Sequence, residues 1–477
     1  MNIPQLQSAQ NQLSSLMMTE RAVTDETTPA HRDTFSRSGR PEPSIILSPL
    51  KTAGIKNSSG TDKAYPALPS DPEEAAACIH KFNANLGLSP ELLKEKCALM
   101  KKDTLSFLRA TPALFIRDMK GPYSDSSQLL PRKAPLLTID GDLHIGNFGT
   151  FKDRDGMIAW GLNDQDQAGP GSPEWDLIRL SVSLILLGRQ NGLSKDEQVD
   201  LIKTLTKKYC KSVKSISEGD VSDSASLAHS ESHGPVKKLI SNAAESTQKD
   251  MLEKYVTLAD SGIYRFKNTR ELKAVTPEEN DSVVNSLREY EKTIDCSSDG
   301  VTHPLQVIDV HQRLGSGGSS YGLRRYWVLV NGESAGDSPV ILELKQLLTP
   351  AVIDHTGDLS KADGLSMVDS QKKLGGYTNP LTGHTKIDGS SYLVREREAA
   401  RSTLSLEELT GSKDLETVTD QIALVSARAH GHTESQVKAL SKWIGRDEKL
   451  LKEKLIDVAT CYADQTEADY RAFKASC

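Results

Sequence analysis

The sequence predicts a mixed α+β fold with two lobes, and three observations support it. Helix-forming patterns fill most of residues 69–300. Segments of strand character, joined by short Gly- and Asn-containing turns, dominate residues 301–400. Residues 401–477 return to helical patterns. We therefore expect a helical lobe first, a β-rich lobe second, and C-terminal helices that complete the helical lobe.

Residues 1–68 form a separate polar segment. They are rich in Ser, Thr, Pro and Asn and show no apolar period, which is typical of disordered or loosely attached chain. A plain tail is the simpler interpretation, and a leader for a non-classical, effector-type export system is the alternative. The first ordered helix is expected at 72, because Ser70 and Asp71 can cap it and Pro72 suits its first turn.

The other elements are predicted from apolar periodicity and turn residues. Helices are expected at 72–84, 89–101, 103–119, 173–187, 194–215, 236–259, 277–293, 364–374 and 413–475. Strands are expected at 135–139, 157–162, 305–314, 323–330, 339–344 and 391–396. Residues 216–235 are rich in Ser, Asp and His, so we expect a loop or insertion there.

Overall composition narrows the functional classes. The net charge of −7 argues against a general nucleic-acid or membrane-surface binder, because phosphate groups require basic partners. The six cysteines form no CxxC pair, which is typical of a reduced intracellular protein without a zinc or disulfide framework. We find neither a signal peptide nor an apolar run long enough to span a bilayer. We therefore expect a cytoplasmic protein without nucleic-acid partners or a membrane span.

Two acidic clusters each follow a predicted buried strand. The first reads Gly-Asp-Leu-His-Ile-Gly-Asn and contains Asp142 and Asn147; the second reads Asn-Asp-Gln-Asp and contains Asp164 and Asp166. Kinase-like phosphotransferases use this spacing to hold a base and two Mg²⁺ ligands, although Asp also favours strand-end turns. We predict Asp142 as the base and Asn147 and Asp164 as metal ligands. Asp166 is either a second carboxylate ligand or a hydrogen-bonding group that fixes the loop.

A Gly-rich loop and a lysine form a second candidate site in the β-rich lobe. The loop joins the first two strands expected there, and the third strand ends in Lys345. Glycines let a hairpin close over phosphate groups, where a Cβ atom would clash, and the lysine would reach the α- and β-phosphates of ATP. The loop residues expected at the nucleotide are Gly315, Gly317, Gly318, Ser319 and Gly322.

The order of these motifs is reversed relative to protein kinases. There the Gly-rich loop and the lysine come first, whereas here Asp142 and Asp164 precede Gly315 and Lys345. The predicted fold is therefore a protein-kinase-like two-lobe α+β fold that is circularly permuted. Because permutation requires termini that lie close together, we expect the final helix, 445–475, beside the first helices of the chain.

From about residue 103 to 475 the chain resembles the bacterial family called domain of unknown function 2252. The matching motifs are Phe107-Leu-Arg109, Gly141–Gly149, Asn163–Asp166, Gly169–Asp176, Tyr392–Arg395, Ala427–His430 and Tyr462–Gln465. The acidic motifs of that family are similar to those of aminoglycoside and choline phosphotransferases, which implies the same roles for Asp142, Asn147 and Asp164. The resemblance also implies an acidic partner for Lys345, which we assign to Asp369. It implies no substrate.

Two departures from the family pattern leave the function open. Ser319 stands where the middle glycine of the loop is expected, and Gln165 replaces an aromatic residue. The first hypothesis is an ATP- and Mg²⁺-dependent phosphotransferase acting on a hydroxyl or amine of an unknown protein or small molecule. The alternatives are AMP transfer by the same fold with the nucleotide inverted, and a pseudokinase or scaffold that binds without catalysis.

Overall fold

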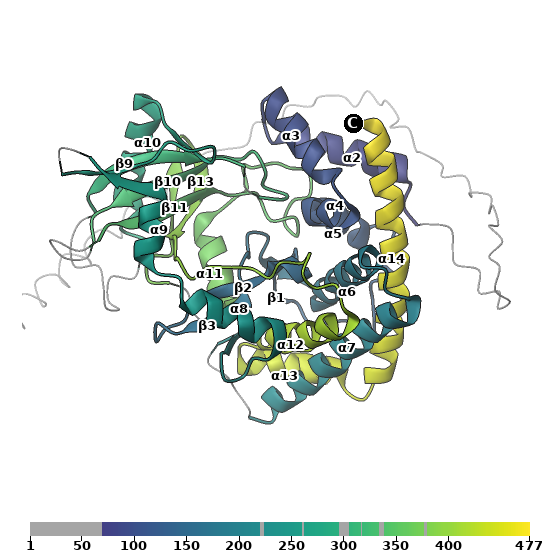
Figure 1. Ribbon diagram of the computed structural model, residues 1–477. Helices are drawn as coiled ribbons and strands as arrows, with labels where there is room; N and C mark the ends of the chain where they lie inside the picture. The colour runs from purple at the N-terminus through teal and green to yellow at the C-terminus, as the bar shows by residue number, and fades with distance from the viewer. Residues whose placement is uncertain are drawn as a thin grey trace, which may run out of the picture. The chain divides into compact units, whose positions relative to one another are not determined.

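The computed structural model has the mixed α+β architecture that the sequence predicts (Figure 1). A six-stranded antiparallel sheet forms one part of it and a group of long helices forms another. The structure describes residues 69–219, 224–259, 262–294, 305–315, 317–332, 338–375 and 379–477. The tail or leader predicted at 1–68 lies outside these residues.

Helices begin where the sequence offers caps and prolines. Asp71 accepts a hydrogen bond from the Glu73 amide at the start of α2, and Ser194 and Glu197 form a capping box at α7. The helices outside the sheet region are α2 (Pro72–Asn85), α3 (Pro90–Met100), α4 (Thr104–Ala110), α5 (Pro112–Lys120), α6 (Pro173–Gln190), α7 (Lys195–Ser217), α8 (Gly234–Ala244), α12 (Ser412–His430), α13 (Glu434–Ile444) and α14 (Glu448–Ser476). Helix α9 (Gln248–Tyr255) packs against the six-stranded sheet, where Tyr255 contacts Trp327. Within the described ranges, none of the helices has the length and apolar character needed to cross a membrane.

Three of the predicted helical segments are interrupted, and the last of them, 413–475, consists of α12, α13 and α14. The helix expected at 103–119 is two helices, because Pro112 has no amide hydrogen with which to continue α4 and instead begins α5. The helix expected at 236–259 is also two, α8 and α9. Its last residues form strand β6 (Val256–Leu258), which pairs with β7 (Tyr264–Phe266).

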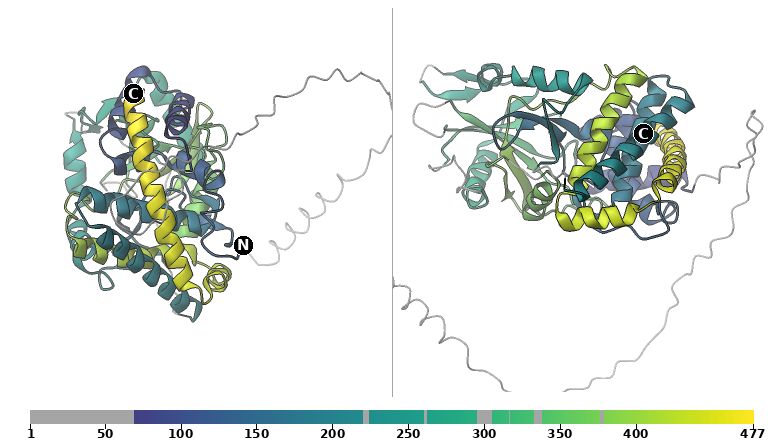
Figure 2. Two further views of the ribbon diagram at one scale, coloured as in Figure 1. Left: turned by 90° about the vertical axis from the view of Figure 1, so that its right-hand side faces the viewer. Right: turned by 90° about the horizontal axis from the view of Figure 1, so that it is seen from below.

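Helix α14 ties the end of the chain to its first described helices (Figures 1 and 2). Phe473 is fully buried, stacks on His80 of α2 and packs against Phe107 of α4. The side-chain amide of Gln465 accepts a hydrogen bond from the Ser70 amide and donates one to the Ser70 carbonyl oxygen. The expected position of the final helix is therefore confirmed.

The β-rich part of the chain is one antiparallel sheet with the strand order β12-β13-β11-β10-β9-β8. Its strands are β8 (Leu272–Ala274), β9 (Val307–Arg313), β10 (Arg325–Val330), β11 (Val340–Gln346), β12 (Gly383–Ile387) and β13 (Ser390–Glu396). Apolar residues of one face pack against α10 (Pro277–Tyr290), whereas Glu343 and Lys345 alternate to the other face. The sequence predicts four of these strands, α10 and α11 (Gly364–Gly375); the short edge strands β8 and β12 are additional.

Two small sheets hold the acidic clusters in place. Strand β1 (Leu137–Ile139) pairs with β4 (Gly169–Gly171), and a three-stranded sheet contains β2 (Phe148–Lys152), β3 (Ile158–Leu162) and β5 (Ser226–Ala228). The first cluster lies between β1 and β2, and the second between β3 and β4. Strand β5 falls within the predicted loop or insertion at 216–235, so that segment is not entirely a loop.

Replacing Phe473 by Ala should destabilise the fold, because the fully buried ring joins α14 to α2 and α4. We expect the free energy of unfolding, measured by urea denaturation, to fall by about 3–5 kcal/mol. The neighbouring exposed residue provides a matched control: Lys474→Ala should change it by no more than about 0.5 kcal/mol. Equal effects of the two substitutions would contradict the described packing of α14.

Candidate active site

The first acidic cluster forms a tight turn between β1 and β2. Gly141 has a φ of +76°, and a Cβ atom there would lie 2.4 Å from the Gln167 carbonyl oxygen, so only glycine fits. The side-chain amide of Asn147 donates to the Asp142 carbonyl oxygen at 2.9 Å and to Asp140 Oδ1 at 3.2 Å. The Asn five positions after Asp142 therefore holds the turn together, and its Oδ1 remains as a potential ligand atom.

Asp176 of α6 stabilises this turn through hydrogen bonds to its backbone. Its carboxylate accepts hydrogen bonds from the backbone amides of Asp140 at 2.8 Å and Gly141 at 2.9 Å. His430 Nε2 of α12 lies 3.1 Å from the same carboxylate, and the Tyr209 hydroxyl of α7 lies 2.9 Å from His430 Nδ1. Three helices thus fix the backbone that carries Asp142.

The Asp142 carboxylate is held by a buried arginine. Arg179 donates from Nε to Asp142 Oδ1 at 2.7 Å and from Nη2 to the Leu108 carbonyl oxygen at 2.7 Å. Burial raises the pKa of Asp142 to about 6, because the loss of water outweighs the opposing charge of Arg179. Asp142 can therefore exchange a proton near neutral pH, as a general base must.

The second acidic cluster meets Lys345. The Lys345 ammonium group lies 3.2 Å from Asp164 Oδ1 and also contacts Asp166 Oδ2. Lys345 is only 4% exposed, and this burial lowers the pKa of its ammonium group despite the nearby charge of Asp164. Partial burial alone would raise the pKa of Asp164, but the charges of Lys345 and Arg395 outweigh it and lower the pKa to about 2. Asp164 is therefore ionised throughout the physiological range.

A buried carboxylate holds two arginines beside Lys345. Glu343 lies opposite Arg395 on the neighbouring strand and accepts bonds from its Nε at 3.2 Å and Nη2 at 3.0 Å. Arg325 Nη1 lies 3.5 Å from the same carboxylate. Burial would raise the pKa of Glu343, but the two guanidinium groups lower it to about 2. The sheet therefore presents positive charge towards Asp164.

The Gly-rich loop rests on α3 and the end of α4. Gly318 approaches the Arg109 carbonyl oxygen so closely that a Cβ atom would lie 3.2 Å from it. The buried Lys96 ammonium group donates to the Ser319 carbonyl oxygen at 2.5 Å, and the Tyr321 hydroxyl donates to Glu95 at 2.9 Å. These contacts hold the tip of the loop over the first acidic cluster.

Most of the predicted site residues line a single pocket. The pocket is lined by Arg109, Asp142, His144, Asn147, Asp164, Asp166, Gln167, Gly318, Ser319 and Ser320. Lys345 reaches it through its contacts with Asp164 and Asp166. Gly315, Gly317 and Gly322 shape the loop, each with a positive φ, but do not line the pocket.

Asp369 is not the partner of Lys345. On α11 the residues that face inwards are Met367, Val368, Gln371 and Leu374. Asp369 lies between them on the exposed side, where its charge acts on His384. The helical period thus turns it away from the sheet. The acidic partners of Lys345 are instead Asp164 and Asp166.

The side chain of Arg109 lines the pocket from α4. Its charge acts on both Asp142 and His144. Among the residues that the structure describes, its guanidinium group has no hydrogen-bond or ion-pair partner. It is therefore available to an anionic ligand. The only signal for it in the sequence is its place in the Phe-Leu-Arg family motif.

The pocket provides oxygen atoms that fit a divalent cation. No group of three or more His, Cys, Asp or Glu side chains within the described ranges could hold a metal ion. Mg²⁺ does not require one, because it binds through one or two carboxylates together with phosphates and water. Asn147 Oδ1 and the Asp164 carboxylate are suitable ligands. The buried Asp140 Oδ2 nearby has no hydrogen-bond partner, and burial together with the charges of Asp176 and Asp142 raises the pKa of that carboxyl group well above its usual value.

Comparison with known proteins identifies a family of similar chains. The model of a family described as "Uncharacterized protein conserved in bacteria (DUF2252)" matches residues 88–476, which is most of the chain. No curated protein and no solved structure matches the chain significantly.

Replacing Asp176 by Asn should loosen the turn that carries Asp142, because an amide accepts at only one of its two polar atoms and leaves a buried donor unpaired. We expect urea denaturation to show a loss of about 1–3 kcal/mol in the free energy of unfolding. Asp464→Asn, at a side chain that is 50% exposed, is the matched control and should stay within about 0.5 kcal/mol. If only Asp464→Asn lowered the free energy of unfolding, Asp176 would not be stabilising the turn that carries Asp142.

Proposed function

This chain belongs to the DUF2252 family of bacterial proteins, and we propose that it is an ATP- and Mg²⁺-dependent phosphotransferase with a circularly permuted, kinase-like fold. The acceptor is a hydroxyl or amine of a protein or small molecule. One observation carries the proposal: Lys345 contacts Asp164 across 181 residues of sequence, in a pocket shared with Asp142, Asn147 and the Gly-rich loop. Those are the parts that ATP-dependent phosphoryl transfer requires.

The position of the final helix supports the permuted arrangement. In a circular permutant the natural ends of the ancestral chain are joined and new ends open elsewhere, so the new termini must lie close together. Here Gln465 of α14 bonds to Ser70, which directly precedes α2. The helices at the end of the chain therefore complete the lobe that the first helices begin.

In the proposed reaction Asp142 orients the acceptor hydroxyl and receives its proton. The acceptor oxygen forms a bond to the γ-phosphorus, the bond from that phosphorus to the bridging oxygen breaks, and ADP leaves with the bonding electrons. Arg179 keeps the Asp142 carboxylate in position. Lys345 binds phosphate oxygens, and Arg109 meets the negative charge on the transferred group.

Asn147 and Asp164 would hold Mg²⁺, which supplies positive charge that offsets the charge of the phosphates. Asp166 remains beside Lys345 when Asp164 turns to the metal. This division explains why the chain places two carboxylates at one ammonium group. The phosphates of the nucleotide compete with Asp164 for Lys345. The Mg²⁺ ion that binds together with the nucleotide then replaces Lys345 as the positive partner of Asp164.

Mg²⁺-ATP should stabilise the protein by mass action. At about 100 times the dissociation constant the gain is about 2.7 kcal/mol, which raises the melting temperature of a chain this long by about 3 °C. Lys345→Ala should abolish most of that shift, while Lys386→Ala, at an exposed lysine of the same sheet, should retain it. Absence of a shift in the wild type, or an equal shift in Lys345→Ala, would contradict nucleotide binding here.

Turnover should depend on the ionised form of Asp142. Because its folded pKa is raised to about 6, kcat/KM for ADP formation should be constant above pH 7 and fall as pH drops through 6. Asp142→Asn should lower kcat by about 10²–10⁴ and keep the Mg²⁺-ATP melting shift. Asp155→Asn, at an exposed turn, is the control and should be as active as the wild type.

Isotope labels separate this proposal from its alternatives. Transfer of label from the γ-phosphate of ATP supports phosphoryl transfer, whereas transfer from the α-phosphate supports AMP transfer. Mg²⁺-ATP binding with no transfer of either label and with Asp142→Asn indistinguishable from wild type would favour a binding module.

A further inference from the structure

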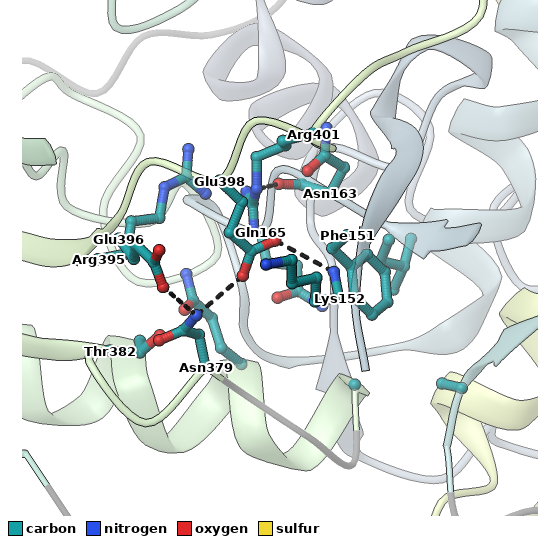
Figure 3. Close-up of a pocket in the computed structure, with 14 residues that line it drawn as sticks. Phe151, Lys152, Asn163, Gln165, Asn379, Thr382, Arg395, Glu396, Glu398 and Arg401 are labelled. Carbon is teal, nitrogen blue, oxygen red and sulfur yellow. Dashed lines mark hydrogen bonds between the residues drawn. The ribbon is translucent and has the colours of Figure 1, made fainter. Parts of the chain in front are cut away.

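A second pocket lies behind the segment that carries Asp164, between the ends of β3, α11 and β13 (Figure 3). Its lining residues come from the ends of these elements, from β2 and from the segment that follows β13. The segment from 163 to 166 separates the two pockets. Asn163 and Gln165 line the second pocket, whereas Asp164 and Asp166 line the candidate active site.

Other polar side chains in this pocket are already bonded to neighbours. Glu398 accepts hydrogen bonds from the Lys152 amide at 3.1 Å and from the Asn379 side chain at 2.9 Å, as Figure 3 shows. Arg395 forms its ion pair with Glu343, outside the pocket. Because these groups already bond to one another, they have few free donors or acceptors for a ligand.

Arg401 is the exception. Its Nη1 donates to the Asn163 carbonyl oxygen at 3.2 Å, but its buried Nε has no hydrogen-bond partner and no carboxylate of the described residues forms an ion pair with it. Burial and the neighbouring charge of Arg395 lower its pKa to about 9. A guanidinium group whose buried Nε lacks an acceptor is costly, and an anion that accepts from this Nε would relieve that cost.

The same place also offers an unpaired acceptor. Asn163 Oδ1 is buried and lacks a hydrogen-bond donor among the described residues. We propose that this pocket binds a small metabolite whose carboxylate or phosphate group pairs with Arg401 and whose adjacent hydroxyl or amine donates to Asn163. The site is distinct from the candidate active site and does not depend on the proposed reaction.

Isothermal titration calorimetry on the full chain tests the site with two anions, inorganic phosphate and glycolate, which carries a hydroxyl beside its carboxylate. We expect saturable binding of at least one, and which one binds identifies the anionic group. Arg401→Gln should weaken that binding about tenfold or more, the usual worth of a charge-assisted hydrogen bond. Arg397→Gln removes a guanidinium group from the same segment but outside the pocket, and should leave the affinity unchanged.

Further measurements test the role of Asn163 and the location of the bound anion. Acetate, which lacks the hydroxyl of glycolate, should bind more weakly if Asn163 accepts from the ligand. Binding that is lost in Lys345→Ala but kept in Arg401→Gln would place the anion in the candidate active site and overturn the inference, as would no binding of either anion. If Arg401→Gln fails to fold, hydrogen exchange of the wild type decides: ligand protection at 162–165 and 395–402 supports the site, and protection only at 314–322 overturns it.

Discussion

The ion pair between Lys345 and the carboxylates of Asp164 and Asp166 is the constraint on which the site depends. Lys345 is almost wholly buried at the end of β11, and an isolated ammonium group there would be strongly disfavoured. The two carboxylates would likewise repel each other without it. The buried ammonium group on the sheet and the paired carboxylates after β3 are therefore each unfavourable without the other. The pocket exists because two distant parts of the chain compensate each other.

The same pocket gives its two main carboxylates opposite properties. Asp142 lies deep against α6, and burial raises its pKa to about 6 in spite of Arg179. Asp164 faces the basic side of the sheet, whose charges lower its pKa to about 2. Environments that separate the pKa values of neighbouring acids are typical of sites that assign them different roles. This contrast suits a base at Asp142 and a permanently charged metal ligand at Asp164.

The sequence allowed prediction of those parts of the site that depend on local structure. Asp142, Asn147 and Asp164 sit in short motifs directly after buried strands, so their spacing alone indicates that they meet. Asp369 was assigned wrongly, because its place on α11 depends on which face of the helix is buried. Arg179 reaches the site only through the packing of α6 against the turn, which no local pattern records. The short strands β8 and β12 likewise depend on pairing with longer neighbours.

The alternation of residues 163–166 gives the two pockets a shared wall, and this has an electrostatic consequence. Arg401 bonds to the carbonyl oxygen of Asn163, and its charge also acts on Lys345. In the proposed arrangement, an anion at Arg401 would weaken the positive field that Asp164 and Lys345 experience. A divalent cation beside Asp164 would then be opposed by less positive charge. Because such coupling is reciprocal, a cation at Asp164 would in turn favour the anion behind it.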